Sequence, residues 1–498
     1  YENYSLIGTD IWLENESHSL NIVVDTFTVA TPTDYYAYPL SQMTFDIENH
    51  SVDPIVGDIY IDPSGSNDNS GTSSGSPFKN IYYGLLSAFA NSSNPGTIHL
   101  TDGTYSPSTN GEYFPLGGKD NVSIIGSSQE GTILNGDSLT SIFYFEDIED
   151  VTISDLMVTN GSAGNGGSIF DNNSNIVYES ISATYNNATG EGGGIYLSNS
   201  NSSLKNLNIT NNSAHTGGGV SIHGGEVNLE NIIINNNNST TVGGGVYLYA
   251  FDAIYPDSET MFNNILVYDN IGTKGGGMYI NASDPLINNA TIYNNISNEN
   301  GGAIFCDQNS HPIVLNSIFS RNNPNEIYYG ANNDYDNTVS ISYSNIEGGE
   351  SGIVTNDNGT INWLAGNIDV DPSFVDPDNG DYHLQDYSLL IGAGIDSVDI
   401  DDTWYYAPDT DIGDNPRPNP EGSNPDIGAY ENQYGEPQHN SLIYVSTNGN
   451  DDGSIGEENA PFATIQAAID YSWDGDTVLV QPGTYTGYTE IDKNNLTL

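Results

Sequence analysis

Four aromatic side chains at one position of a repeat are the residues of this chain best suited to contact a ligand. Tyr196, Tyr247, Tyr279 and Phe305 each follow a glycine run and one aliphatic residue. Because a sugar can pack its apolar face on a flat aromatic ring, we predict these residues as a carbohydrate-binding platform. Ser221 interrupts the line, which favours the alternative of an aromatic ladder that only stabilises a sheet.

Acidic turns offer a second kind of candidate site, for a calcium ion. Carboxylates and amides gather at residues 62–69, 369–381, 399–414 and 448–452. Hard cations bind oxygen ligands, so we predict Ca²⁺ as the cofactor, with solvated acidic turns as the alternative. None of these clusters has the spacing of an EF-hand loop. The predicted ligands are Asp62, Asp68, Asp369, Asp371, Asp376, Asp378, Asp451 and Asp452.

The cysteine and the histidines are weaker candidates for functional residues. The one cysteine, Cys306, excludes an internal disulfide and is expected to point inward as an inert buried thiol. His215 and His223 flank one corner of the repeat without a companion set of ligands. We therefore interpret both histidines as solvated side chains.

The elements that position these residues follow from an internal repeat. A glycine run followed by an apolar residue returns with a period of about 25 or 26 residues, stretched once by an insertion at residues 250–260. A column of asparagines keeps the same period. Two columns in phase predict a solenoid of stacked β-rungs. The asparagine column is Asn160, Asn186, Asn212, Asn237, Asn270, Asn295 and Asn322.

Each rung is expected to contain two strands and two kinds of bend. The residues that follow a glycine run alternate between aliphatic and aromatic, as in Ile195, Tyr196 and Leu197, which places the aliphatic side chains inside. The glycines would form corners with positive φ. The asparagines would stack into an amide ladder, and we expect the same of a second line. That line is Asn206, Asn231, Asn264, Asn289 and Asn316.

The order of these patterns predicts the domain organisation. An opening motif at residue 58 recurs at residue 442, and both copies contain a helical segment that would cap the first rung of a solenoid. The first residue is not Met and the last lies in an apparent strand, so we expect a piece of a longer protein. The predicted parts are 1–57, a small β-rich module or lead-in; 58–433, a solenoid with entry (58–120), regular rungs (121–345) and closing segment (346–433); 434–441, a linker; and 442–498, a second solenoid that is cut short.

The charge excludes some partners. Lys and Arg total 7 against 66 Asp and Glu, a formal charge of -59, which excludes binding to nucleic acid phosphates or anionic membranes. No apolar run is long enough to insert into a bilayer. Roughly 20 Asn-x-Ser/Thr sequons occur, as a chain rich in these residues produces by chance. Candidate glycan acceptors among them are Asn208, Asn211, Asn281 and Asn295.

Several segments resemble known families. Residues 301–304 (Gly-Gly-Ala-Ile) and 319–322 (Phe-x-x-Asn) resemble the repeat of chlamydial polymorphic outer-membrane proteins. The openings at 58 and 442 resemble the entry segment of pectin-lyase-like proteins, and residues 371–431 are similar to an ending common in large bacterial surface proteins. The resemblance implies an all-β, right-handed parallel β-helix that is secreted or displayed on a bacterial surface and is often adhesive.

The same resemblance raises an enzymatic alternative, because this fold includes pectate lyases, alginate lyases and polygalacturonases. A lyase needs a cation and a basic side chain that takes a proton. The regular rungs contain only Lys205, Lys274 and Arg321, at different positions of the repeat. We therefore predict a non-catalytic extracellular or cell-surface structural or adhesive protein within a longer tandem array. Its predicted partners are glycans, proteins or copies of itself; the alternative is a polysaccharide-binding or polysaccharide-cleaving module.

Overall fold

A computed structural model of the chain describes residues 11–12, 19–24, 37–38, 42–47, 52–250, 259–331, 336–451, 454, 456–491 and 493–498. Two compact units result. The first comprises Tyr1–Asp369 with Asp411–Asp414, and the second comprises Val370–Thr410 with Asn415–Leu498. This division differs from the predicted one, because the boundary falls inside the predicted closing segment and joins most of that segment to residues 442–498.

Near the N-terminus, four short strands are described. β1 (Ile11–Trp12) pairs in parallel with β3 (Ala37–Tyr38), and β2 (Leu20–Val24) pairs in parallel with β4 (Met43–Ile47). The described part of residues 1–57 is therefore rich in β-structure.

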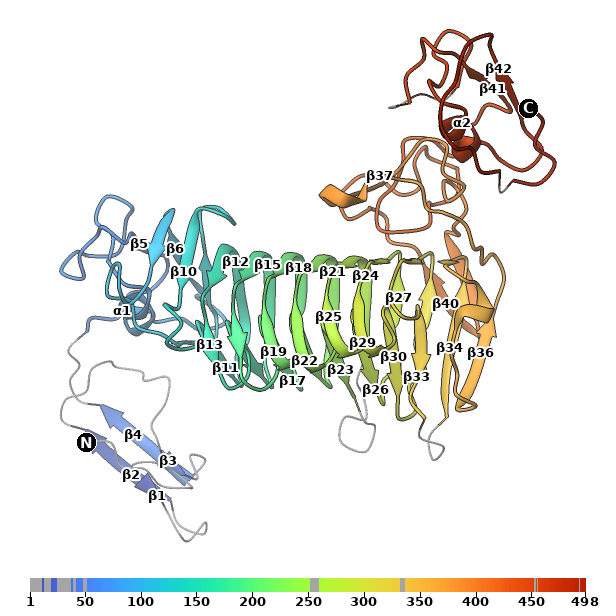
Figure 1. Ribbon diagram of the computed structural model, residues 1–498. Helices are drawn as coiled ribbons and strands as arrows, with labels where there is room; N and C mark the ends of the chain where they lie inside the picture. The colour runs from blue at the N-terminus through green and yellow to red at the C-terminus, as the bar shows by residue number, and fades with distance from the viewer. Residues whose placement is uncertain are drawn as a thin grey trace. The chain divides into compact units, whose positions relative to one another are not determined.

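Three parallel sheets build the rest of the first unit. We name them sheet A, sheet B and sheet C, and they contain 17, 9 and 6 strands. Figure 1 shows the turns stacked in sequence order from α1 (Ile81–Ser87) to β36 (Gly359–Trp363). The parallel pairing of successive turns confirms the predicted all-β, parallel β-helix with a short capping helix.

The strand bounds define the sheets. Sheet A contains β5 (Ile59–Ile61), β6 (Gly96–Leu100), β7 (Gly103–Tyr105), β9 (Val122–Ile125), β10 (Thr132–Asn135), β12 (Glu149–Thr159), β15 (Asn175–Thr184), β18 (Ser203–Thr210), β21 (Glu226–Asn235), β24 (Glu259–Tyr268), β27 (Leu286–Asn288), β28 (Thr291–Tyr293), β31 (Ile313–Leu315), β32 (Ile318–Ser320), β34 (Asn337–Ser342), β35 (Asn345–Ile346) and β36. Sheet B contains β8 (Leu116–Gly117), β11 (Phe143–Glu146), β14 (Ile169–Asn172), β17 (Ile195–Ser198), β20 (Val220–His223), β23 (Val246–Tyr249), β26 (Met278–Asn281), β30 (Ile304–Asp307) and β33 (Ile327–Tyr329). Sheet C contains β13 (Ser162–Ala163), β16 (Asn187–Ala188), β19 (Ser213–Thr216), β22 (Asn238–Val242), β25 (Ile271–Lys274) and β29 (Ile296–Asn300).

The core forms because the same inward positions recur in every rung. In sheet B, Ile195, Val220, Val246 and Met278 are register partners and all are buried. Rungs lie about 4.8 Å apart in a parallel stack, so each aliphatic side chain packs on its counterpart in the next rung. The result is one continuous apolar core along the first unit.

The glycine runs form the corner before sheet B for two separate reasons. Gly192 has a φ of 65°, in the left-handed region that favours glycine. Gly193 lies so close to the next rung that an added Cβ would approach the carbonyl oxygen of Gly218 to 2.2 Å. The repeat therefore needs glycine at both positions.

The main asparagine ladder lies at the bend between sheets A and C. Each asparagine except the last donates its backbone N–H and its side-chain amide to Oδ1 of the asparagine one rung further, at distances of 2.8–3.0 Å. Stacked amides thus satisfy one another where the backbone turns away from the sheet. The members are Asn186, Asn212, Asn237, Asn270, Asn295 and Asn322.

Asn160, predicted as the first member of this ladder, is not part of it. Its φ is 51°, and its amide donates to Oδ1 of Asn135 at 3.2 Å. Gly161 occupies the ladder position instead, and its N–H donates to Oδ1 of Asn186 at 2.8 Å. The ladder therefore begins one rung later than predicted, at Asn186.

The second line of asparagines lies at the bend within sheet A. All five have positive φ, between 48° and 57°. Hydrogen bonds of 3.0–3.3 Å between side-chain amides join Asn231 to Asn206, Asn264 to Asn231 and Asn316 to Asn289. Asparagine suits this bend because it tolerates the left-handed conformation and bonds along the stack.

Both openings have the same hydrogen-bonding pattern. The Tyr105 hydroxyl donates to the carbonyl oxygens of Ile61 and Thr101 at 3.2 and 3.0 Å. The Tyr485 hydroxyl donates to Val445 and Gln481 at 3.3 and 2.9 Å. Each tyrosine therefore fastens the end of its second strand to the end of its first.

Nine further elements are described, one in the first unit and eight in the second. They are η2 (Glu350–Gly352) in the first unit, then β37 (Phe374–Asp376), η3 (Pro377–Asn379), β38 (Asp381–Leu384), β39 (Ser397–Ile400), β40 (Thr403–Tyr406), β41 (Leu442–Val445), α2 (Ile465–Tyr471) and β42 (Thr477–Val480) in the second. The first two strand pairs are antiparallel, and β41 pairs with β42 in parallel.

A buried ion pair joins two residues near the end of the predicted closing segment. Nε of Arg417 donates to Oε2 of Glu431 at 2.9 Å, and both side chains are fully buried. Asp426 lies beside this pair and accepts from the backbone of Gly392 and Asn432. Arg417 is therefore a structural cation of the second unit.

Candidate functional site

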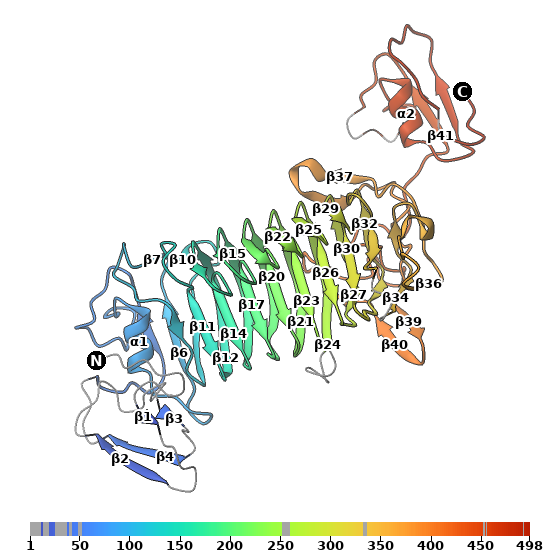
Figure 2. The same cartoon turned by 60° about the horizontal axis from the view of Figure 1, so that its bottom comes forward.

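The predicted aromatic line is a continuous stack of rings on the outer face of sheet B, whose strands lie side by side in Figure 2. Neighbouring aromatic rings in the stack have centroids 4.6–5.8 Å apart. This spacing follows from the rung spacing of about 4.8 Å. The register partners in this column are Tyr144, Phe170, Tyr196, Ser221, Tyr247, Tyr279, Phe305 and Tyr328.

His223 fills the gap that Ser221 leaves in the stack. Its ring lies 5.3 Å from Tyr196 and 5.5 Å from Tyr247. The side chain is only 15% exposed, and Nε2 lies 2.5 Å from Oε2 of Glu191. The interpretation of His223 as a solvated side chain was wrong, because the small Ser221 leaves room for a ring from the same strand.

The inner members of the stack are poor candidates for a sugar platform. Stacked rings cover the faces of one another, and Tyr279 and Phe305 are only 7% and 3% exposed. Burial raises the pKa of Tyr247 to about 12, and the Tyr279 hydroxyl donates to Asp307 at 2.6 Å. A sugar ring needs an uncovered aromatic face.

Tyr144, at the end of the stack, differs from the other members. Its ring stacks on Phe170 at 4.6 Å and 4°, and it is 42% exposed. On its other side, the register partner in β8 is Gly117, where even an added Cβ would meet no atom within 4 Å. One face of the Tyr144 ring is therefore uncovered.

A shallow groove of about 510 Å³ lies beside this ring. Tyr144 and Phe170 line it together with the corner residues Asn165 and Thr189. The prediction missed Tyr144 because no glycine run precedes it. The signal that could have found it is the alternation of Phe143, Tyr144 and Phe145, in phase with the later rungs.

Glu191 follows this corner in the chain and gives the surface negative charge. Burial alone would raise its pKa, but bonds from His223 and from the Ser221 hydroxyl lower the pKa below its usual value. The carboxylate is thus held as an anion, and its contacts fix His223 within the stack.

The basic residues of the rungs lie in or next to three separate strands, β18, β25 and β32. Lys205, in sheet A, pairs with Glu230 at 3.0 Å. Lys274 ends β25 in sheet C, 5.5 Å from the centroid of the Phe305 ring. Arg321 follows β32 of sheet A and lies over Tyr293 at 5.7 Å. The structure does not bring these three together.

The predicted calcium ligands are spread over separate turns. Where hydrogen bonds of these carboxylates are described, each carboxylate has its own donors: Ser64 and Thr101 for Asp62, Gly348 for Asp369, Ser373 for Asp371, Asn379 for Asp376, and Ala463 and Thr464 for Asp451. Asp68 and Asp378 are exposed, and Asp452 lies outside the described residues. Among the residues that the structure describes, no group of three or more His, Cys, Asp or Glu could hold a metal ion.

The predicted glycan acceptors and the cysteine differ in access. Asn211 is exposed and Asn208 and Asn281 are half-buried, but Asn295 is fully buried in the ladder and cannot accept a glycan in the folded protein. Cys306 is buried in β30. Neither helix in the described ranges has the length and hydropathy of a membrane span.

Comparison with known proteins gives the following similarities. The chain is similar to the pectate lyase Pel9A, with 14% identity, a TM-score of 0.41, and coverage of 76% of this chain and 97% of that chain. It is also similar to XylC in complex with xylose, with 10% identity, a TM-score of 0.38, and coverage of 75% of this chain and 98% of that chain. A rhamnogalacturonan lyase is similar with 12% identity, a TM-score of 0.31, and coverage of 64% of this chain and 90% of that chain. No curated protein matches the chain. Residues 63–343 match the family described as protein of unknown function (DUF1565), and the chain belongs to that family.

Proposed function

We propose that the β-helix is a non-catalytic extracellular or cell-surface module that binds neutral polysaccharides, and that Tyr144 is its main contact. The observation that carries this proposal is the exposed ring of Tyr144, which lines a shallow groove together with Asn165 and Thr189. An aromatic face packs on the apolar face of a sugar, and the Asn165 amide and Thr189 hydroxyl can bond its hydroxyl groups.

The charge supports a neutral ligand. The chain has a formal charge of -59, and Glu191 adds a carboxylate next to the groove. Such a surface repels uronates and sulfated glycans. Neutral chains avoid this repulsion and still offer hydroxyl donors to the acidic side chains.

The proposal of binding without cleavage rests on the basic residues. Proton abstraction next to a uronate needs a base and a cation at one place. Lys205, Lys274 and Arg321 lie on separate parts of the surface. The resemblance of the repeat to chlamydial surface proteins supports display outside the cell, where an adhesive module would meet glycans, proteins or copies of itself.

The experiment is a binding screen of the whole chain against neutral and acidic polysaccharides. Tyr144→Ala is expected to weaken neutral-polysaccharide binding about tenfold or more, equivalent to about 1.4 kcal/mol. Tyr113→Ala, which removes another exposed tyrosine, is the control and should bind like the wild type. Equal binding by Tyr144→Ala and wild type would remove the proposed site, and release of new chain ends would overturn the non-catalytic assignment.

Calcium stays a proposal of its own, for the stability of the acidic turns rather than for binding. Its support is the oxygen-rich composition of turns such as 369–381. An ion bound only by the folded protein would raise the melting temperature. The melting temperature should therefore fall when EGTA is added and return with Ca²⁺; an unchanged value would overturn the proposal.

A further inference from the structure

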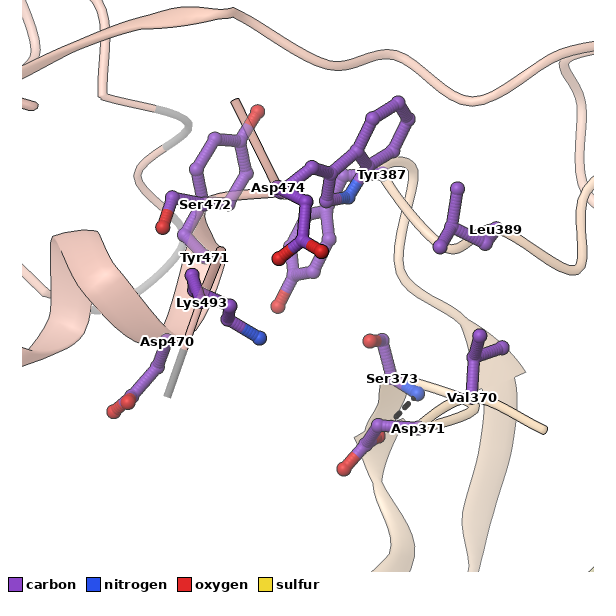
Figure 3. Close-up of a pocket in the computed structure, with 11 residues that line it drawn as sticks. Val370, Asp371, Ser373, Tyr387, Leu389, Asp470, Tyr471, Ser472, Asp474 and Lys493 are labelled. Carbon is purple, nitrogen blue, oxygen red and sulfur yellow. Dashed lines mark hydrogen bonds between the residues drawn. The ribbon is translucent and has the colours of Figure 1, made fainter. Parts of the chain in front are cut away.

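The second unit contains a cavity of about 480 Å³ that no part of the proposed function uses. One wall comes from the end of α2 and the residues after it, and the other from Val370 to Leu389 (Figure 3). Its volume lies in the range of small-molecule sites, about 300–1,000 Å³.

Three aromatic side chains form the apolar wall of this cavity. They are Tyr387, Tyr471 and Trp473. The rings of Tyr387 and Tyr471 pack edge to face, with centroids 4.7 Å apart. This contact brings together residues that lie far apart in the sequence.

His439 and Asp476 hold Trp473 in place on the side away from the cavity. The His439 ring covers one of its faces, at 3.7 Å and 8°. Oδ2 of Asp476 accepts from Nε2 of His439 and from the backbone N–H of Trp473, both at 2.6 Å. The His439 and Asp476 side chains are buried. Because His439 occupies one face, the indole can offer the cavity only its other face and its edge.

Polar groups of both signs complete the lining. Asp371, Asp474 and Lys493 border the cavity, and Figure 3 shows Asp474 and Lys493 pointing into the space in front of Ser373. Asp474 is itself held by the backbone N–H and the side chain of Asn494, at 2.7 and 2.9 Å. The cavity thus combines carboxylate acceptors with an ammonium donor.

We propose that this cavity binds a neutral sugar residue, as a second glycan site that is separate from the Tyr144 groove. The aromatic wall fits the apolar face of a sugar, and the carboxylates and ammonium fit its hydroxyl groups as acceptors and donor. An acidic ligand would face three aspartates, Asp371, Asp470 and Asp474. A cationic ligand would have to compete with Lys493 for these carboxylates.

The test uses the whole chain and an array of neutral mono- and disaccharides. Trp473→Ala and Lys493→Met are each expected to weaken binding of the same saccharides by about tenfold or more. Trp404→Ala is the matched control, because Trp404 is 57% exposed in the same unit and does not line the cavity. Lys493→Met also keeps the test valid if Trp473→Ala fails to fold.

Comparing the saccharides lost in these variants with those lost in Tyr144→Ala distinguishes binding at the cavity from binding at the Tyr144 groove. If only the Tyr144 groove exists, the Trp473 and Lys493 variants will bind every saccharide as the wild type does, which overturns this inference alone. Competition by choline would overturn the neutral-sugar assignment in favour of a cation. Saccharides lost in both cavity variants and kept in Tyr144→Ala would support it even if the groove binds nothing.

Discussion

The carboxylate of Glu326 accepts the backbone N–H of Asn322 at 3.1 Å and its side-chain amide at 2.6 Å. These are the two donors that every earlier asparagine in the ladder gives to the next asparagine. Glu326 therefore ends the ladder by taking the place of a further amide. Because the carboxylate is buried, its pKa is raised to about 8.

This arrangement predicts a loss of stability with rising pH. As the pH rises from about 4.5 towards about 8, the unfolded chain gives up the Glu326 proton while the folded protein keeps it, so the free energy of unfolding falls. Gln resembles the protonated acid and does not titrate. Glu326→Gln should match the wild type near pH 5 and exceed it at pH 8, by on the order of 2 kcal/mol. Denaturant unfolding at both pH values measures the difference; a constant difference would contradict the prediction.

Asn237, in the middle of the ladder, should be difficult to replace. Its side chain accepts from Asn212 and donates to Asn270 and to the Ile209 carbonyl oxygen. Asn237→Ala leaves these buried groups without partners, which should lower the free energy of unfolding by about 2–4 kcal/mol.

Asn238→Ala is the matched control for that variant. Asn238 is the next residue, is exposed and is not part of the ladder. Its replacement should change stability by no more than about 0.5 kcal/mol. If both variants were equally stable, the ladder would contribute nothing specific.

Removal of Arg417 should destabilise the second unit far more than the loss of a surface ion pair. Arg417→Met leaves the buried carboxylates of Glu431 and Asp426 without their cation, at a cost of about 3–5 kcal/mol. Lys205→Met removes a half-exposed partner of Glu230 and should cost about 1 kcal/mol or less. Limited proteolysis of both variants would show whether Arg417→Met alone opens the segment that contains it.

The fold was predictable because one local pattern repeats in every rung. Inward aliphatic positions such as Ile195 and Val220 recur in phase, and parallel stacking then follows. The error at Asn160 is local: Asn212 lies three residues after the inward Ile209, whereas Asn160 lies only two after the inward Val158. Counting from the preceding inward residue would have placed Gly161 in the ladder.

The binding surfaces were less predictable, because they depend on what covers each ring. The rung spacing could have shown that Tyr247 and Tyr279 cover one another. No sequence pattern indicated that His223 would fill the gap at Ser221, or that Tyr387 and Tyr471 would line one cavity. These relations arise from packing between positions that no short motif connects.

Cys306 provides a chemical probe of rung opening. Its thiol is buried between rungs, with Ile280 and Tyr329 as register partners, and burial raises the pKa of the thiol. Because the thiolate is the reactive form, the folded protein should not react with a disulfide reagent such as DTNB at pH 8, whereas the denatured chain should release one equivalent of product. In the Asn237→Ala variant, partial opening should speed the reaction, and Asn238→Ala should not change it. Rapid labelling of the wild type without denaturant would contradict the buried position of this side chain.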